Sequence, residues 1–104
     1  MMSEFKNVTV KTAANVYFDG KCVSHTLIFP DGARKTLGII FPSQLSFSTG
    51  DPERVEITAG TCKVRLDGEA NWQEYAAGQS FTVPGNSKFD IETTAPLQYI
   101  CHFG

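Results

Sequence analysis

Hydrophobic and polar residues alternate along most of this chain, which is the pattern of strands with one buried face. The alternation is clearest in residues 55–59, 62–66, 81–83, 89–91 and 97–103. Turn sequences such as Pro30-Asp31-Gly32, Thr49-Gly50-Asp51-Pro52 and Pro84-Gly85-Asn86 separate these segments. Short strands between regularly spaced turns predict an all-β sandwich or closed barrel.

Helical periodicity is weak, and residues 71–77 allow at most one helical turn before Gly78. A chain of 104 residues fits one domain. We expect residues 1–15 to form an N-terminal segment, loosely held at residues 1–6, and residues 16–104 to form the single domain.

Charge, hydropathy and cysteine content argue against nucleic-acid binding, membrane insertion, a disulfide framework and a zinc site. The 9 Lys and Arg and the 11 Asp and Glu residues are interspersed, so no basic face is expected for a nucleic acid. No apolar run approaches the ~18 residues of a membrane span, and the start lacks the apolar core of a leader. Cys22, Cys62 and Cys101 form no C-x-x-C pair, which argues against a disulfide framework or a zinc site. We therefore expect a cytoplasmic protein with reduced thiols and no membrane partner.

Two segments resemble the motifs of the cupin family. The first runs from Ser46 to Gly60, where cupins have two His, a Glu and a Gly. The second runs from Gly78 to Phe89, where cupins have a Gly, a Pro and a further ligand His. The resemblance implies a single RmlC-like cupin domain, that is, a double-stranded β-helix or jelly-roll barrel.

The metal ligands of the cupin motifs are largely missing here. The resemblance places Ser46 and Ser48 at two imidazole positions, Glu53 at the carboxylate and Phe89 at the last His. One carboxylate with two neutral hydroxyls binds a transition metal poorly, so we expect neither a metal nor another cofactor. In the cavity, Ser46 and Ser48 would share one strand face, with Phe89 as an aromatic wall and Glu53 pointing inward. The alternative is that both serines lie on an exposed strand face and Glu53 is a solvated turn residue.

From Val16 to Phe103 the chain resembles the small single-domain pyrimidine/purine nucleoside phosphorylases of bacteria. The stretches that carry the resemblance include Phe47-Ser48-Thr49, Trp72-Gln73 and Pro84-Gly85-Asn86-Ser87-Lys88-Phe89. The resemblance implies a homodimer that cleaves purine and pyrimidine nucleosides with inorganic phosphate as co-substrate, giving free base and ribose 1-phosphate. Our candidate for the dimer contact is the segment of residues 17–27.

Arg34 is the candidate for binding the phosphate, because its guanidinium fork matches phosphate geometry. Ser46 and Ser48 would add hydroxyl donors to the same phosphate. Arg34 is equally compatible with a solvated position after the preceding turn.

Glu53 would bind ribose hydroxyls or stabilise positive charge near the anomeric carbon. The candidate catalytic residues are Glu53 and Ser48. Phe89 and Tyr99 would stack on base or sugar, and stacking tolerates different bases. The alternative makes both aromatic residues part of the core. His102 is opposite in strand parity to Tyr99, which leaves open which of them faces inward.

Two other functions fit parts of the sequence. One is a small-ligand barrel that binds a sugar or nucleotide without turnover. The other is a metal-dependent oxidation or isomerisation with His25 and His102 as relocated ligands.

Overall fold

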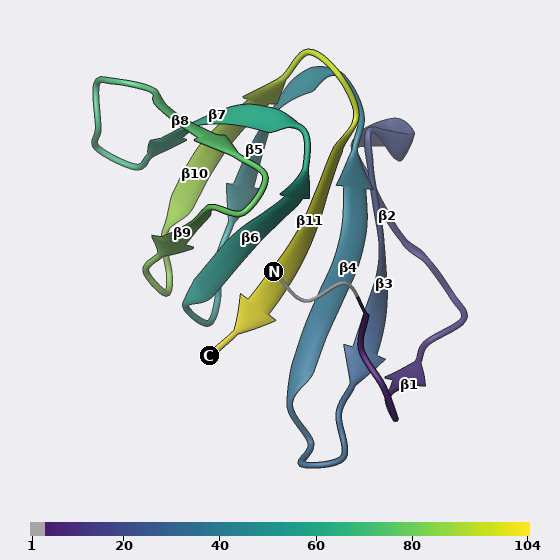
Figure 1. The fold of residues 1–104 in the computed structure, drawn as a ribbon. Coiled ribbons are helices and arrows are strands. Elements are labelled where there is room, and N and C mark those ends of the chain that lie inside the picture. Colours follow the sequence, from purple (N-terminus) through teal and green to yellow (C-terminus); the bar gives the residue numbers. More distant parts are fainter. Residues whose placement is uncertain (1–3) are drawn as a thin grey trace.

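The computed structural model describes residues 4–104, which are almost entirely β-structure (Figure 1). One short 3-10 turn, η1 (Phe18–Gly20), lies between the second and third strands. The strands are β1 (Thr9–Val10), β2 (Asn15–Tyr17), β3 (Cys22–Ile28), β4 (Arg34–Ile40), β5 (Ser43–Ser48), β6 (Glu53–Ala59), β7 (Thr61–Leu66), β8 (Gln73–Ala76), β9 (Ser80–Val83), β10 (Lys88–Thr93) and β11 (Leu97–Phe103). The all-β prediction is confirmed.

The strands form two antiparallel sheets that face one another (Figure 1). The larger sheet has seven strands in the order β1-β3-β4-β11-β6-β9, with β2 also paired to β3. The smaller sheet has four strands in the order β5-β10-β7-β8. Two sheets packed in this way bury one face of each, which explains the period of two in the sequence.

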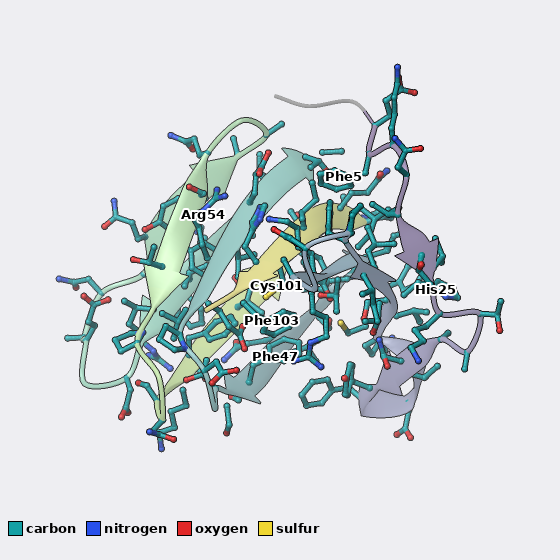
Figure 2. The ribbon with its side chains drawn as sticks, turned by 90° about the horizontal axis from the view of Figure 1, so that it is seen from below. Phe5, His25, Phe47, Arg54, Cys101 and Phe103 are labelled. Atoms are coloured by element: carbon teal, nitrogen blue, oxygen red, sulfur yellow. The ribbon has the colours of Figure 1, made fainter. Side chains whose placement is uncertain are left out.

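The core lies between the sheets and consists of the inward residues of both. Its most deeply buried side chains are Ile57, Ile91, Leu97, Val64, Val83 and Cys22. On the central strand β11, Tyr99 and Cys101 are buried in this core, whereas His102 bonds to Glu56 and Lys35. Tyr99 therefore faces inward and His102 outward. Figure 2 shows Cys101 between the sheets and His25 and Arg54 at the outside.

Residues 71–77, for which the sequence allowed at most one helical turn, contain strand β8 instead. Its residues pair with β7, with Glu74 opposite Lys63 and Tyr75 opposite Cys62. Cross-strand partners of opposite charge and an aromatic ring packed on Phe81 favour the strand. A segment this short takes its conformation from the edge that it joins.

The N-terminal segment is attached to the larger sheet. Both β1 and β2 pair with β3, and the Phe5 ring packs edge-on against Phe29 at 5.3 Å. Strand β2 runs across the expected boundary at residue 16. Of the residues expected to be loosely held, 1–3 lie outside the described part. Between residues 4 and 104, no helix is long and apolar enough to cross a membrane.

Candidate functional site

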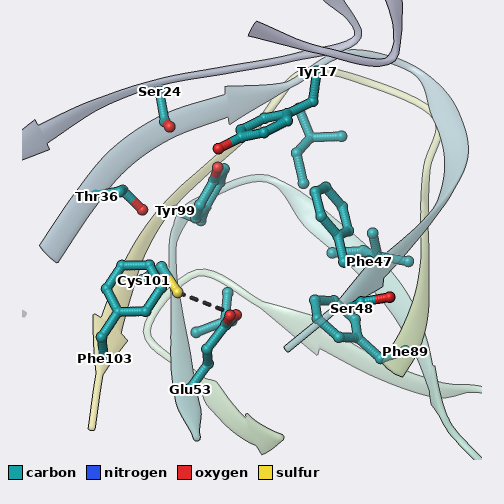
Figure 3. A pocket seen from close by; sticks show the side chains of 13 residues that line it. Tyr17, Ser24, Thr36, Phe47, Ser48, Glu53, Phe89, Tyr99, Cys101 and Phe103 are labelled. Carbon is teal, nitrogen blue, oxygen red and sulfur yellow. Dashed lines mark hydrogen bonds between the residues drawn. The ribbon is translucent and has the colours of Figure 1, made fainter. Parts of the chain in front are cut away.

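A cavity of about 200 Å³ lies between the two sheets, and we call the end lined by Glu53, Phe103 and the exposed Ser48 its mouth. Its lining comes from both sheets, including β2 of the larger one (Figure 3). The residues that line it are Tyr17, Ser24, Thr36, Ile40, Phe47, Ser48, Glu53, Val55, Phe89, Ile91, Tyr99, Cys101 and Phe103.

The register of β4, β11 and β6 arranges the cavity floor in rows. Thr36, Cys101 and Val55 form one row across the three strands. The next row toward the mouth contains Glu53, which pairs with Phe103. Because inward residues recur every second position, these rows place a carboxyl, a thiol and a hydroxyl on one surface.

Glu53 is the ionisable carboxyl of this cavity lining. It is partly buried, and its Oε1 atom accepts a hydrogen bond from the Cys101 thiol at 3.4 Å. Burial raises the pKa of Glu53, and the bond from Cys101 offsets part of that rise. Burial also raises the pKa of the Cys101 thiol, which therefore stays protonated and remains a donor. The cavity thus holds a carboxyl that can exchange hydrogen bonds or a proton with a ligand.

Tyr99 is held deep in the cavity by a close approach to β4. A Cβ on Gly38 would lie 2.8 Å from the Tyr99 hydroxyl, so only glycine leaves room for the ring. The Tyr99 hydroxyl lies 3.3 Å from the Cys22 sulfur. Burial raises the pKa of Tyr99 above its usual range, so the phenol stays neutral.

Aromatic rings form the opposite wall of the cavity. Phe47 and Phe89 are stacked at 5.5 Å with 20° between their planes, and Phe18 meets Phe47 edge-on at 5.2 Å. Phe89 is buried and Phe47 is partly buried. Aromatic rings that line a cavity in this way suit a planar aromatic ligand.

The structure does not bring Ser46 to the cavity, although the cupin spacing placed it there. Its hydroxyl donates to Asp90 on the outer face of the smaller sheet, where Arg65 also pairs with Asp90 at 2.8 Å. The reason is the register of β5, in which Leu45 and Phe47 take the inward positions. Ser48 lies at the exposed rim of the cavity.

Arg34 lies beside the cavity rather than in its lining. Its guanidinium carbon stands 4.7 Å from the centre of the Phe103 ring, which does line the cavity. Of the predicted site residues, Ser48, Glu53, Phe89 and Tyr99 therefore line one cavity, with Arg34 at its mouth.

Sequence reasoning missed Tyr17, Thr36 and Phe47 as lining residues. Phe47 could have been found, because it alternates with Leu45 as the apolar face of β5. Tyr17 and Thr36 have no such signal, because they belong to strands whose inner face is partly polar.

The cavity does not fit the metal site of the cupin motifs. Ser46 faces away, Phe89 belongs to the core, and the Cys101 thiol is protonated. His25 bonds to the Lys11 carbonyl and His102 to Glu56, so neither supplies a ligand to the cavity. Across residues 4–104, no three His, Cys, Asp or Glu side chains gather as metal ligands.

Many known proteins resemble this chain in fold or in sequence. One solved structure, from Methanocaldococcus jannaschii, is described as an RmlC-like cupin with a double-stranded β-helix fold. It matches this chain with a TM-score of 0.66 and 16% identity, over 92% of this chain and 92% of its own. The cupin prediction is thereby confirmed for the fold. A solved structure of a protein of unknown function from Acinetobacter sp. ADP1 is 50% identical, with a TM-score of 0.96 over 97% of this chain and 98% of that one.

Curated relatives carry one name. A protein of Methylobacillus flagellatus called pyrimidine/purine nucleoside phosphorylase is 64% identical over 98% of this chain and 99% of its own length. A protein of Cupriavidus necator with the same name is 65% identical over 98% of this chain and 97% of its own length. The family profile described as pyrimidine/purine nucleoside phosphorylase matches residues 12–103. The chain therefore belongs to the pyrimidine/purine nucleoside phosphorylase family.

Proposed function

We propose that this protein catalyses the metal-independent phosphorolysis of purine and pyrimidine nucleosides to free base and α-D-ribose 1-phosphate. The observation that carries the proposal is the position of Glu53 between two unlike walls (Figure 3). One wall is aromatic, with Phe47 and Phe89, and the other is polar, with Thr36 and Tyr99. A nucleoside has the same division into a planar base and a hydroxyl-bearing sugar.

In the reaction, an oxygen of hydrogen phosphate forms a bond to the anomeric carbon while the N-glycosidic bond breaks. The bonding electron pair leaves with the base, and the proton of hydrogen phosphate ends on the base, so atoms and charge balance. Ionised Glu53 would bind the ribose hydroxyls and stabilise the positive charge that develops on the sugar. Ser48, at the rim, would donate a hydroxyl to the reactants as they enter.

A broad choice of bases follows from the nature of the aromatic wall. The Phe47 and Phe89 rings offer no hydrogen bonds, so a base held there is bound through its π face. Every purine and pyrimidine has such a face, whereas their hydrogen-bonding edges differ.

The test is base release from adenosine, inosine and uridine by the purified protein, with and without phosphate, followed by chromatography. We expect phosphate-dependent release and formation of ribose 1-phosphate. The Glu53→Gln variant should lose most of this activity, whereas Glu92→Gln, on the outer face of β10, should keep it. Absence of phosphate-dependent release from every nucleoside would refute the proposal, and nucleoside-induced thermal stabilisation without product would indicate a binding protein instead.

We also propose that the protein is a cytoplasmic homodimer. Its three cysteines are free thiols, as in proteins of a reducing compartment. The outer face of β2, β3 and β4 carries Val16, Leu37 and Ile39, which are 60%, 46% and 37% exposed. A second copy would cover this face through a two-fold contact that includes β3, part of the segment predicted from sequence. Light scattering should give twice the mass of the chain for the wild type. The Leu37→Lys variant should have a measured mass closer to that of the monomer. A monomeric wild type would exclude the dimer.

A further inference from the structure

The proposed reaction places the sugar at Glu53 but assigns no residues to the phosphate. The part of the polar wall that β3 and β4 contribute contains Ser24 and Thr36, and Arg34 stands at its outer end. We propose that inorganic phosphate binds on this wall, held by Arg34, Thr36 and Ser24. This inference rests on the proposed phosphorolysis and assigns the site of its co-substrate.

The strand register brings the three groups to one surface. Arg34 and Thr36 are two positions apart on β4, so their side chains share its inner face. On the neighbouring strand β3, Thr26 pairs with Thr36 and Ser24 pairs with Gly38. Ser24 is therefore the diagonal neighbour of Thr36, and Gly38 adds no side chain that would separate a ligand from it.

The hydroxyl groups of this wall are available as donors. Asn15 donates its amide to Ser24 at 3.2 Å and to Thr26 at 3.1 Å, which occupies acceptor positions and leaves the hydroxyl protons. A hydroxyl rotates freely about its bond to carbon, so each proton can turn toward an anion. Ser24 is only 3% exposed, so a hydrogen bond from its hydroxyl to a ligand would be shielded from water.

The electrostatics of the wall favour an anion. Arg34 takes part in none of the ion pairs found among residues 4–104, and its side chain is exposed beside the Phe103 ring. The neighbouring Tyr99 and Cys101 are neutral because burial raises the pKa of each. Glu53 is the nearby acid, and its Oε1 atom already accepts the hydrogen bond from the Cys101 thiol at 3.4 Å. A guanidinium fork and aligned hydroxyls are the usual partners of a phosphate oxygen.

Of the two serines predicted to contact the phosphate, Ser48 lies at the rim of the cavity, and Ser46 lies on the outer face of the smaller sheet. Arg65 pairs with Asp90, and Ser46 donates to the same carboxylate. A phosphate beside Ser46 would meet the negative charge of Asp90. The outer face of β5 is therefore a poorer anion site than the inner face of β4.

The position of the wall also suits the chemistry. Thr36 pairs directly with Cys101, whose thiol bonds to Glu53, so a phosphate on Thr36 would adjoin the carboxyl that binds the sugar. The base would lie across the cavity on Phe47. Phosphate and base then approach the anomeric carbon from opposite sides, as a displacement requires.

Steady-state kinetics with phosphate varied at saturating uridine, and with uridine varied at saturating phosphate, test the inference. The variant Thr36→Val keeps the shape of the side chain and removes its hydroxyl. We expect its KM for phosphate to rise about tenfold or more, the usual effect of losing a hydrogen bond to a charged group, with little change in the KM for uridine. Arg34→Met should give a larger rise, Thr36→Ser should restore the wild-type value, and the exposed Thr61→Val should match the wild type.

Three results would separate the inference from the proposed function. Unchanged KM for phosphate in both Thr36→Val and Arg34→Met would overturn the inference while leaving phosphorolysis intact. A rise in KM for phosphate in Ser46→Ala instead would place the anion on the outer face of β5. If the wild type shows no phosphate-dependent turnover, the proposed function fails, and thermal melts with inorganic phosphate alone decide the anion site: a rise in Tm that both variants abolish supports it, and no rise refutes it.

Discussion

Adding one methyl group at Gly38 should destabilise the protein and disturb the cavity together. In the Gly38→Ala variant, the new Cβ would stand 2.8 Å from the Ser24 Cβ, the Val23 carbonyl oxygen and the Tyr99 hydroxyl. The first two atoms belong to the paired strand β3, so they cannot move without opening the sheet. The third can move only by displacing the Tyr99 ring. The methyl group therefore has no free direction.

The size of the effect follows from these contacts. Overpacking of a closed core costs about 1–3 kcal/mol. A shifted Tyr99 would lose its contact with Cys22, which adds about 0.5–1.5 kcal/mol. Alanine offsets about 0.5–1 kcal/mol, because it loses less backbone freedom in a strand than glycine. We expect a net loss of about 2 kcal/mol, which for a domain of this size lowers Tm by about 8–16 °C.

The assay is thermal unfolding followed by circular dichroism, at one fixed protein concentration for all variants. Gly50→Ala is the matched control, because its Cβ would meet no atom within 4 Å. The double variant Gly38→Ala with Tyr99→Phe should lose less than the sum of the two single changes, since the hydroxyl is one of the three obstructions. If Gly38→Ala and Gly50→Ala unfold within about 0.5 kcal/mol of each other, the close approach of Tyr99 to β4 does not limit this position.

Two further predictions follow from the ionisable groups. Glu53→Gln should lower kcat by about 10²–10³-fold. Burial raises the pKa of Glu53 above 4.5, so the wild type loses stability as pH rises through that pKa, whereas the variant has no such group. The Tm of the variant should therefore rise relative to that of the wild type between pH 4 and 7, and a constant difference in Tm would contradict this. Burial lowers the pKa of His102 below 6.5, so protonation costs the wild type stability as pH falls below 6.5, and His102→Gln should reduce the loss of Tm between pH 7 and 5. Lys35 and Arg54 lower the same pKa and Glu56 raises it. His25→Gln is the control, and an unchanged slope in His102→Gln would contradict the assignment.

The sequence predicted the strands of the core well, because one buried face imposes a period of two. Residues 55–59 and 97–103 became β6 and β11, and the structure settles that Tyr99 and Cys101 of β11 face inward. Residues 73–76 were harder, because a segment of four residues has no period of its own and pairs with whatever edge is open. Strands β3 and β4 were harder still, since Leu37 and Ile39 are exposed while polar residues such as Thr36 face the cavity.

The candidate site was predicted where strand parity and chemistry agree. Glu53 and Tyr99 line the cavity because both lie on inward positions of central strands, and their roles toward a ligand stay predictions. Ser46 was placed by motif spacing, and the register of β5 overrode that spacing through Leu45 and Phe47. The Thr36 hydroxyl could not be foreseen, because its partners lie on strands far apart in the chain.

Strand β11 occupies the middle of the larger sheet, between β4 and β6, although it follows every other described strand in the chain. While the chain is being made on a ribosome, β4 and β6 therefore have no partner between them until β11 has emerged. Pairing that depends on distant segments is slow to nucleate. The nascent chain consequently passes through a stage in which two open strand edges and an uncovered apolar interior are accessible to chaperones, and the cavity exists only once that stage is over.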